Sequence, residues 1–149
     1  MSDGADLAAT LRAALVTARK SQNKDRTLVL GTILANLKNR ELELQRAPVN
    51  DDVVDVLRKG IKLRREAAEQ FTKAGRQELA DVEAAQIRVL EEFLPAEADP
   101  VEIRAAVREA IAGGAGDIGK VMGAVLPRFK GRADGKVVNQ IVREELAAG

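Results

Sequence analysis

Apolar residues recur three to four positions apart through the first 94 residues, as they do along one face of an α-helix. The pattern predicts four helices: one over 7–20, a longer one that opens at Asn23 or Asp25 and ends at Ala47-Pro48, one over 53–73 and one over 77–93. The side chains expected on the buried stripes are Leu7, Leu11, Leu15, Ala18, Leu30, Ile33, Leu34, Leu37, Leu44, Val53, Val56, Leu57, Ile61, Ala68, Phe71, Leu79, Val82, Val89, Leu90 and Phe93.

Residues at the predicted helix ends support these boundaries. Asp6 and Asn50 stand where an N-cap side chain is needed, and Ala74-Gly75 is typical of a helix C-terminus. Gly31 lies inside the second stripe, although glycine costs about 1 kcal/mol relative to alanine within a helix. We therefore expect Gly31 to allow a neighbouring helix to approach closely.

A proline-bounded segment, residues 95–100, separates this half from the rest of the chain. Beyond it, Asp99 starts a fifth helix, Asp117 a short one that ends by Leu126, and Asp134 the last one. No alternating strand pattern occurs in the sequence. We predict an all-α protein with an N-terminal helical subdomain, 1–95, and a C-terminal three-helix subdomain, 96–149.

Composition excludes several kinds of chemistry. The 149 residues include no cysteine and no histidine, so thiolate nucleophiles, imidazole bases and the usual zinc sites are absent from the chain. Net charge is +1, and the three aromatic residues are all phenylalanine. The first six residues are polar, and no apolar run reaches the roughly 18 residues of a membrane span. We expect a cytoplasmic protein with no membrane partner, cofactor, metal or catalytic residue.

The segment Gly114–Lys120 has the GxxxxGK spacing of a nucleotide-binding phosphate loop. The match fails because Val121 follows where Ser or Thr must bind magnesium, and because a helix rather than a buried strand is predicted before it. Gly119 and Gly123 are four residues apart and share one helix face, so we expect them to allow close packing of a neighbouring helix. Together with Gly131 they are interpreted as structural glycines.

Five cations lie between Lys120 and Lys136, offset by one acid beside the last helix, Asp134. Such a cluster, next to the free amides of a helix N-terminus, is suited to the backbone of a polyanion. A solvated basic loop is equally compatible with the pattern. A second basic group, Arg58, Lys62 and Arg65, shares a face of the third helix and is interpreted mainly as a solvated surface with ion pairs.

The basic segment resembles a known family. Residues 116–123, Gly-Asp-Ile-Gly-Lys-Val-Met-Gly, and 130–139, Lys-Gly-Arg-Ala-Asp-Gly-Lys-Val-Val-Asn, are similar to the signature of the GatB/YqeY family. Upstream, residues 64–71 and 74–80 resemble its stand-alone members, as does Phe93-Leu94-Pro95, where Tyr would be more usual before Leu-Pro. Such proteins share a C-terminal domain with the B subunit of glutamine-dependent tRNA amidotransferases.

The resemblance implies a helical, tRNA-associated accessory protein. Carried over by position, the candidate RNA-binding residues are Lys120, Arg128, Lys130, Arg132, Lys136 and Asn139. Candidate partners are tRNA and an amidotransferase or aminoacyl-tRNA synthetase. The family label, carbon–nitrogen ligase with glutamine as amido-N-donor, implies an enzyme, but this chain offers no catalytic constellation and we expect it to be non-catalytic alone. The alternative is a helical protein–protein interaction module that binds no nucleic acid.

Overall fold

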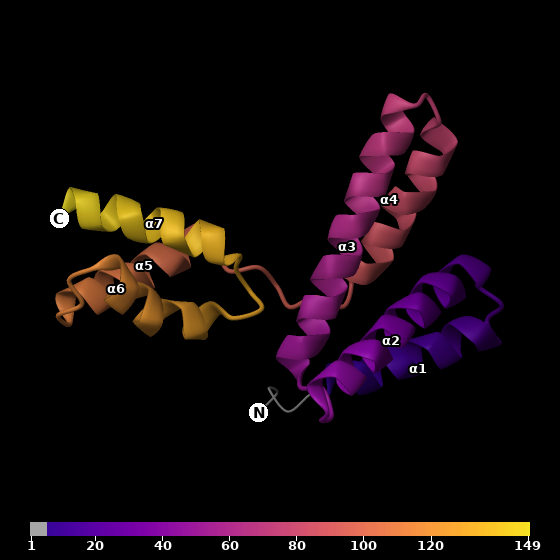
Figure 1. Cartoon of the computed structure of the whole chain (residues 1–149), viewed down its shortest axis with the longest axis horizontal. Helices are drawn as coiled ribbons and strands as arrows, with labels where there is room; N and C mark the ends of the chain where they lie inside the picture. Colours follow the sequence, from indigo (N-terminus) through magenta and orange to yellow (C-terminus); the bar gives the residue numbers. More distant parts are fainter. Residues whose placement is uncertain (1–5) are drawn as a thin grey trace. The chain divides into compact units, whose positions relative to one another are not determined.

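A computed structural model describes residues 6–149, so the polar N-terminal segment, apart from Asp6, lies outside the described residues. Across residues 6–149 the protein is all-α, as predicted (Figure 1). The chain divides into two compact units, the first ending at Leu94 and the second comprising Pro95–Gly149. The sequence predicts a boundary between residues 95 and 96.

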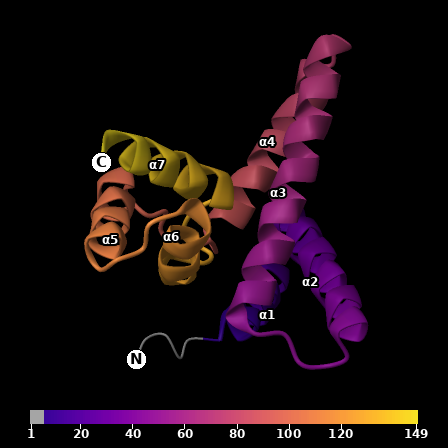
Figure 2. The same ribbon diagram turned by 60° about the vertical axis from the view of Figure 1, so that its left-hand side comes forward.

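The first unit contains two helical hairpins. Its helices are α1 (Leu7–Lys20), α2 (Lys24–Leu44), α3 (Asn50–Lys73) and α4 (Gln77–Glu91). Leucine, isoleucine and valine side chains from all four helices form one buried core. Figures 1 and 2 show that the far ends of α3 and α4 extend beyond the α1–α2 hairpin. The turn between them needs Gly75, whose φ of 75° is unfavourable for other residues.

The start of α3 differs from the prediction. Asn50 is the first residue of the helix rather than its N-cap, and its side-chain oxygen accepts a hydrogen bond from the backbone N–H of Leu7 at 2.9 Å. Asn50 therefore links α1 to α3. The Asp52 carboxylate instead accepts from the backbone N–H of Val49, which precedes the helix, at 2.8 Å.

The close approach expected at Gly31 occurs at another glycine. A Cβ at Gly31 would meet no atom within 4 Å, so the prediction for this residue is wrong. A Cβ at Gly60 on α3 would lie 2.7 Å from the Cδ1 of Ile33 on α2. Gly60 is buried and permits the two helices to pack closely.

Within the first unit, one residue of the predicted buried stripes is on the surface. Val82 on α4 has 53% of its surface exposed, whereas Leu90 on the same helix is fully buried. The first two turns of α4 extend beyond most of the core, so a regular stripe of apolar residues along the helix is buried over only part of its length.

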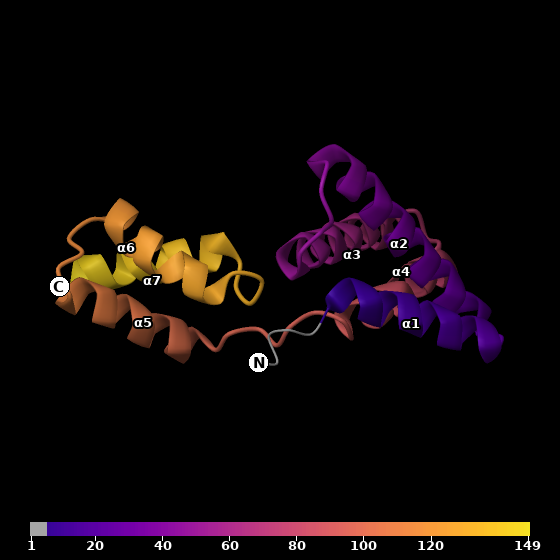
Figure 3. The same cartoon turned by 90° about the horizontal axis from the view of Figure 1, so that it is seen from below.

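The second unit is a three-helix bundle of α5 (Pro100–Ala112), α6 (Ile118–Val125) and α7 (Gly135–Ala148). The three helices lie side by side in Figure 3, and their core includes Ile103, Val121 and Val138. A short 3-10 helix that the sequence did not predict, η2 (Leu126–Phe129), contains Pro127 and places Phe129 in this core. Asp99, Asp117 and Asp134 cap the three helices as predicted.

Candidate nucleic-acid interface

Helix α6 carries the first of the predicted basic residues. Its N-cap, Asp117, accepts a hydrogen bond from the backbone N–H of Lys120 at 2.9 Å, which fixes the start of the helix. Val121 and Val125 are buried in the core of the unit. Gly119, Lys120 and Gly123 are exposed, so one side of α6 packs and the other is left to solvent.

The two glycines of α6 do not serve the packing role expected of them. A Cβ at Gly123 would meet no atom within 4 Å, and one at Gly119 would meet only the carboxylate of Asp117, at 3.4 Å. Neither has a positive φ. They leave a flat, exposed surface beside Lys120 that the packing of this unit does not require. Gly131 differs, because its φ of 79° lies in the left-handed region that favours glycine.

Arg132 holds the start of the second unit against the η2–α7 connection. Its guanidinium donates to the Glu102 carboxylate, with a closest distance of 3.1 Å, and to the Ala96 carbonyl at 3.3 Å. Its own carbonyl accepts from the backbone N–H of Ala98 at 2.8 Å. The guanidinium carbon also lies 6.0 Å from the centroid of the Phe129 ring. These contacts give Arg132 a structural role within the chain.

Three other predicted contact residues have partners in the protein. Arg128 pairs with Glu109 on α5 at 3.4 Å, and both side chains are exposed. Asn139 accepts a hydrogen bond from the Nε of Arg143 at 2.7 Å. Lys130 is exposed and also interacts within the chain. Exposed pairs such as Arg128–Glu109 contribute little to stability and exchange readily for other partners.

Lys120 and Lys136 differ from these residues. Both are exposed, and within residues 6–149 neither side chain makes a hydrogen bond or ion pair. Lys136 is in the first turn of α7, on the side opposite the buried Val138 and Val142. Asn139 and Arg143, three and seven residues further on, lie on the same side of α7, and Arg143 is a cation that the sequence reasoning missed.

The structure also contains a network of ion pairs between α5 and α7 that the sequence pattern does not predict. Arg104 pairs with Glu144 and Glu145, and Arg108 pairs with Glu145, at 2.6–2.7 Å. Hydrogen bonds from Arg108 and Arg104 hold the pKa of Glu145 below its ordinary value, and those from Arg104 and Gln140 do the same for Glu144. The two arginines are therefore engaged inside the unit. Nothing in the local sequence pattern indicates pairs 37 to 41 residues apart.

The basic group on α3 belongs to the first unit and is partly engaged. Arg65 pairs with Glu91 on α4 at 3.4 Å, and Arg58 is half-buried and has a partner. Lys62 is exposed. This arrangement agrees with the interpretation of a solvated surface with ion pairs.

The geometry of residues 6–149 bears on a phosphate loop, a metal site and a membrane span. The segment before Gly114 is helix α5 rather than the strand that a nucleotide-binding phosphate loop follows. Within residues 6–149, no group of three or more Asp or Glu side chains is placed to hold a metal ion. None of the described helices combines the length and the apolar composition that crossing a lipid bilayer requires.

Known proteins similar to this chain include one family, whose model matches most of the chain, and two individual relatives. The model of the YqeY-like protein family matches residues 8–146. An uncharacterized protein of Schizosaccharomyces pombe is 36% identical over 96 residues, which are 64% of this chain and 78% of the relative. A Pyrenophora tritici-repentis protein named "Altered inheritance of mitochondria protein 41, mitochondrial" is 30% identical over 145 residues, 93% of this chain and 80% of the relative.

Proposed function

The chain belongs to the YqeY-like family, and from this premise we propose that it is a tRNA-associated binding protein that is non-catalytic alone. In this proposal the exposed side of α6 meets the RNA backbone, and Lys120 and Lys136 contact phosphates. A cation that no carboxylate of the protein neutralises can contact a phosphate without first giving up an ion pair. Lys120 and Lys136 meet that condition among the residues predicted from the sequence.

The observation that carries the proposal is the position of Lys120 beside Gly119 and Gly123 on the exposed side of α6. Two glycines inside a helix of eight residues each cost about 1 kcal/mol relative to alanine. No close contact within the unit accounts for them, since their Cβ positions are open or nearly so. A surface without side chains lets the sugar–phosphate backbone approach the helix while Lys120 reaches a phosphate from its edge.

The remaining candidates have revised roles in this proposal. Arg132 supports the fold of the unit, and Asn139 orients Arg143. Arg128 and Lys130 contribute to the positive potential near the interface, which assists encounter with RNA rather than fixing its position. In this proposal amide transfer belongs to a separate amidotransferase, because this chain has no histidine or cysteine for that chemistry. An amidotransferase or an aminoacyl-tRNA synthetase is the proposed protein partner.

A salt titration with a matched control tests the proposal. The affinity of the full chain for unfractionated tRNA is measured at 50–300 mM KCl for the wild type, Lys120→Ala/Lys136→Ala and Lys62→Ala/Lys73→Ala. The first double variant is expected to bind several-fold more weakly at low salt and to lower the slope of log affinity against log salt by about 2 at most. The control removes the same charge from exposed lysines of the first unit.

Two results would contradict the proposal: no binding of tRNA at 50 mM KCl, or equal losses in both double variants. The first result would favour the alternative of a protein–protein interaction module without nucleic-acid binding. The cytoplasmic location predicted from the sequence stays a prediction, because the name of one relative describes that relative as mitochondrial.

A further inference from the structure

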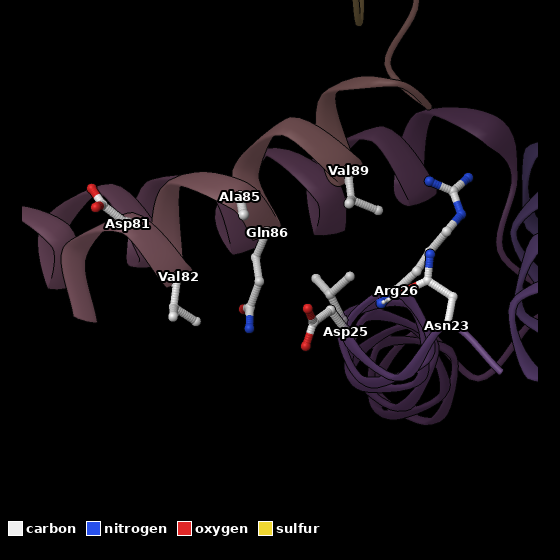
Figure 4. A pocket seen from close by; sticks show the side chains of 9 residues that line it. Asn23, Asp25, Arg26, Asp81, Val82, Ala85, Gln86 and Val89 are labelled. Atoms are coloured by element: carbon white, nitrogen blue, oxygen red, sulfur yellow. Dashed lines mark hydrogen bonds between the residues drawn. The ribbon is translucent and has the colours of Figure 1, made fainter. Parts of the chain in front are cut away.

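A hollow of about 460 Å³ lies in the first unit, between the first turns of α2 and the length of α4 (Figure 4). Four apolar residues line it: Val29, Val82, Ala85 and Val89. Val29 is buried and belongs to the core, whereas Val82 is 53% exposed at the rim. The hollow therefore exposes apolar surface that the four-helix core leaves uncovered.

The polar residues that line this hollow differ in whether their side chains have partners within the protein. Arg26 pairs with Glu92 at 3.0 Å and lies over the Phe93 ring, so its charge is already matched. Asp25 carries a carboxylate that makes no hydrogen bond or ion pair within residues 6–149. Figure 4 shows this carboxylate on the side of the hollow where the Gln86 side chain ends. Asp81, on the outer rim, accepts only from Gln77.

The orientation of Gln86 adds a donor to the hollow. The Nε of Arg64 donates to its side-chain oxygen at 2.8 Å, and arginine can only donate. The amide oxygen must therefore face Arg64 and α3, which leaves the NH₂ group on the side of the hollow (Figure 4). The hollow thus combines aliphatic side chains and one amide donor with two carboxylates, Asp25 and Asp81, that make no ion pair within residues 6–149.

Leu28 extends the apolar surface along α2. With 3.6 residues per turn, Asp25 lies between Val29 and Leu28 around the helix circumference. Leu28 is 62% exposed. A partner seated on Val82 and extending toward α2 would thus pass the Asp25 carboxylate before it reached Leu28.

We propose that this hollow docks a helical segment of a partner protein, with aliphatic side chains at helical spacing and a lysine or arginine beside them. Two helices that frame an apolar hollow accept a third helix in the usual helix-in-groove manner. Charge complementarity favours a partner with lysine or arginine beside its apolar residues, because Asp25 and Asp81 form no ion pair within residues 6–149. The same carboxylates repel phosphate, so this surface is separate from the proposed RNA contact on α6.

A second hollow on the same unit provides a matched control. It is about 330 Å³ in volume, lies between α2 and α3, and is lined mainly by polar and charged residues of both signs. Leu63 on its rim is 53% exposed, the same fraction as Val82. Substituting Leu63 or Val82 by serine therefore removes comparable exposed apolar surface from two different places.

The test selects helical peptides from a displayed library against the full chain and measures their affinities by fluorescence anisotropy. Selected peptides should share aliphatic residues at i, i+3 or i+4, and i+7, with lysine or arginine beside them. Val82→Ser should weaken binding at least about tenfold, while Leu63→Ser should not change it. Asp25→Asn should weaken binding at 50 mM KCl and matter less at 500 mM KCl.

Several results would overturn the proposal. These are a selection without binders, binders with acidic flanks, and affinities that Val82→Ser leaves unchanged. Light scattering on the purified chain tests a second copy as the occupant: a dimer that Val82→Ser converts to monomer would replace the partner helix by another molecule of this chain. Circular dichroism of each variant establishes that the helices are retained.

Discussion

Arg132 lies over the ring of Phe129, with 6.0 Å between its guanidinium carbon and the ring centroid, and it reaches Glu102 and the Ala96 carbonyl from the same position. The contact joins the η2–α7 connection to the segment that leads into α5. A residue that the sequence suggests as an RNA contact is thereby engaged in holding the second unit together.

Arg132→Ala is expected to destabilise the second unit by about 1–2 kcal/mol, from the loss of one cation–π contact and one partly exposed ion pair. Arg132→Lys should recover little of this, because a lysine cannot bridge the carboxylate and the carbonyl in the same geometry. Urea unfolding followed by circular dichroism measures the change. Lys136→Ala is the control, with no loss expected. Equal stability of Arg132→Lys and the wild type would reduce the role of Arg132 to its charge.

Two helical glycines should respond to alanine in opposite directions. Gly31→Ala is expected to stabilise the first unit by about 0.5–1 kcal/mol, since its Cβ position is open and alanine favours helix. Gly60→Ala should cost about 1 kcal/mol net, because displacement of the fully buried Ile33 outweighs the gain in helix propensity. Thermal unfolding of both variants distinguishes them. A stabilising Gly60→Ala would mean that the Ile33 side chain rotates away without loss of packing.

These contrasts explain which features the sequence could predict. Helix number and capping depend on neighbours within a few residues, so the sequence identifies the caps Asp6, Asp99, Asp117 and Asp134 and leaves Asn23 and Asp25 as alternatives, of which Asn23 is the cap. Which face meets another helix depends on tertiary packing. For that reason the sequence pattern predicts a close approach at Gly31 although it occurs at Gly60, and a buried Val82 although Val82 is exposed.

The candidate site shows the same contrast between local features and features that depend on tertiary packing. The basic cluster is visible in the sequence because its residues are near one another along the chain. The sequence does not show which of these cations form ion pairs within the protein. The acids that pair with Arg128 and Arg132 lie on α5, 19 and 30 residues away along the chain. No local pattern carries that information.

Acid should remove one stabilising contact of the first unit. Hydrogen bonds from Arg46 and from the backbone N–H of Val49 hold the pKa of Asp52 below its ordinary value. A carboxyl whose pKa is lower in the folded state stabilises the fold above its unfolded pKa, about 4, and this contribution is lost as the pH falls through the folded value. Asp52→Asn should therefore be destabilised at pH 7 and pH 5, with the difference from wild type shrinking below pH 4.

Urea unfolding of both proteins at pH 7, 5, 4 and 3 measures that difference. Glu144 and Glu145 also have lowered pKa values, but they lie in the second unit and are unchanged in the variant. Subtracting the two curves isolates Asp52. A constant difference from pH 7 to pH 3 would mean that the neutral acid holds Arg46 and Val49 as well as the carboxylate does.

Gly123→Ala should separate stability from RNA binding. Its Cβ position is open, so alanine is expected to stabilise α6 by about 0.4–1 kcal/mol. If the RNA backbone approaches this face, the added methyl group keeps it away from the helix, and the affinity for tRNA should fall although the protein is more stable and its charge is the same. Gly31→Ala makes the same chemical change in the first unit and should leave tRNA affinity unaltered. Thermal unfolding and a tRNA titration at 100 mM KCl measure the two effects. A more stable Gly123→Ala with unchanged affinity would exclude this face of α6 as the contact, whereas a loss confined to Gly123→Ala would link the exposed glycines to RNA binding independently of any lysine.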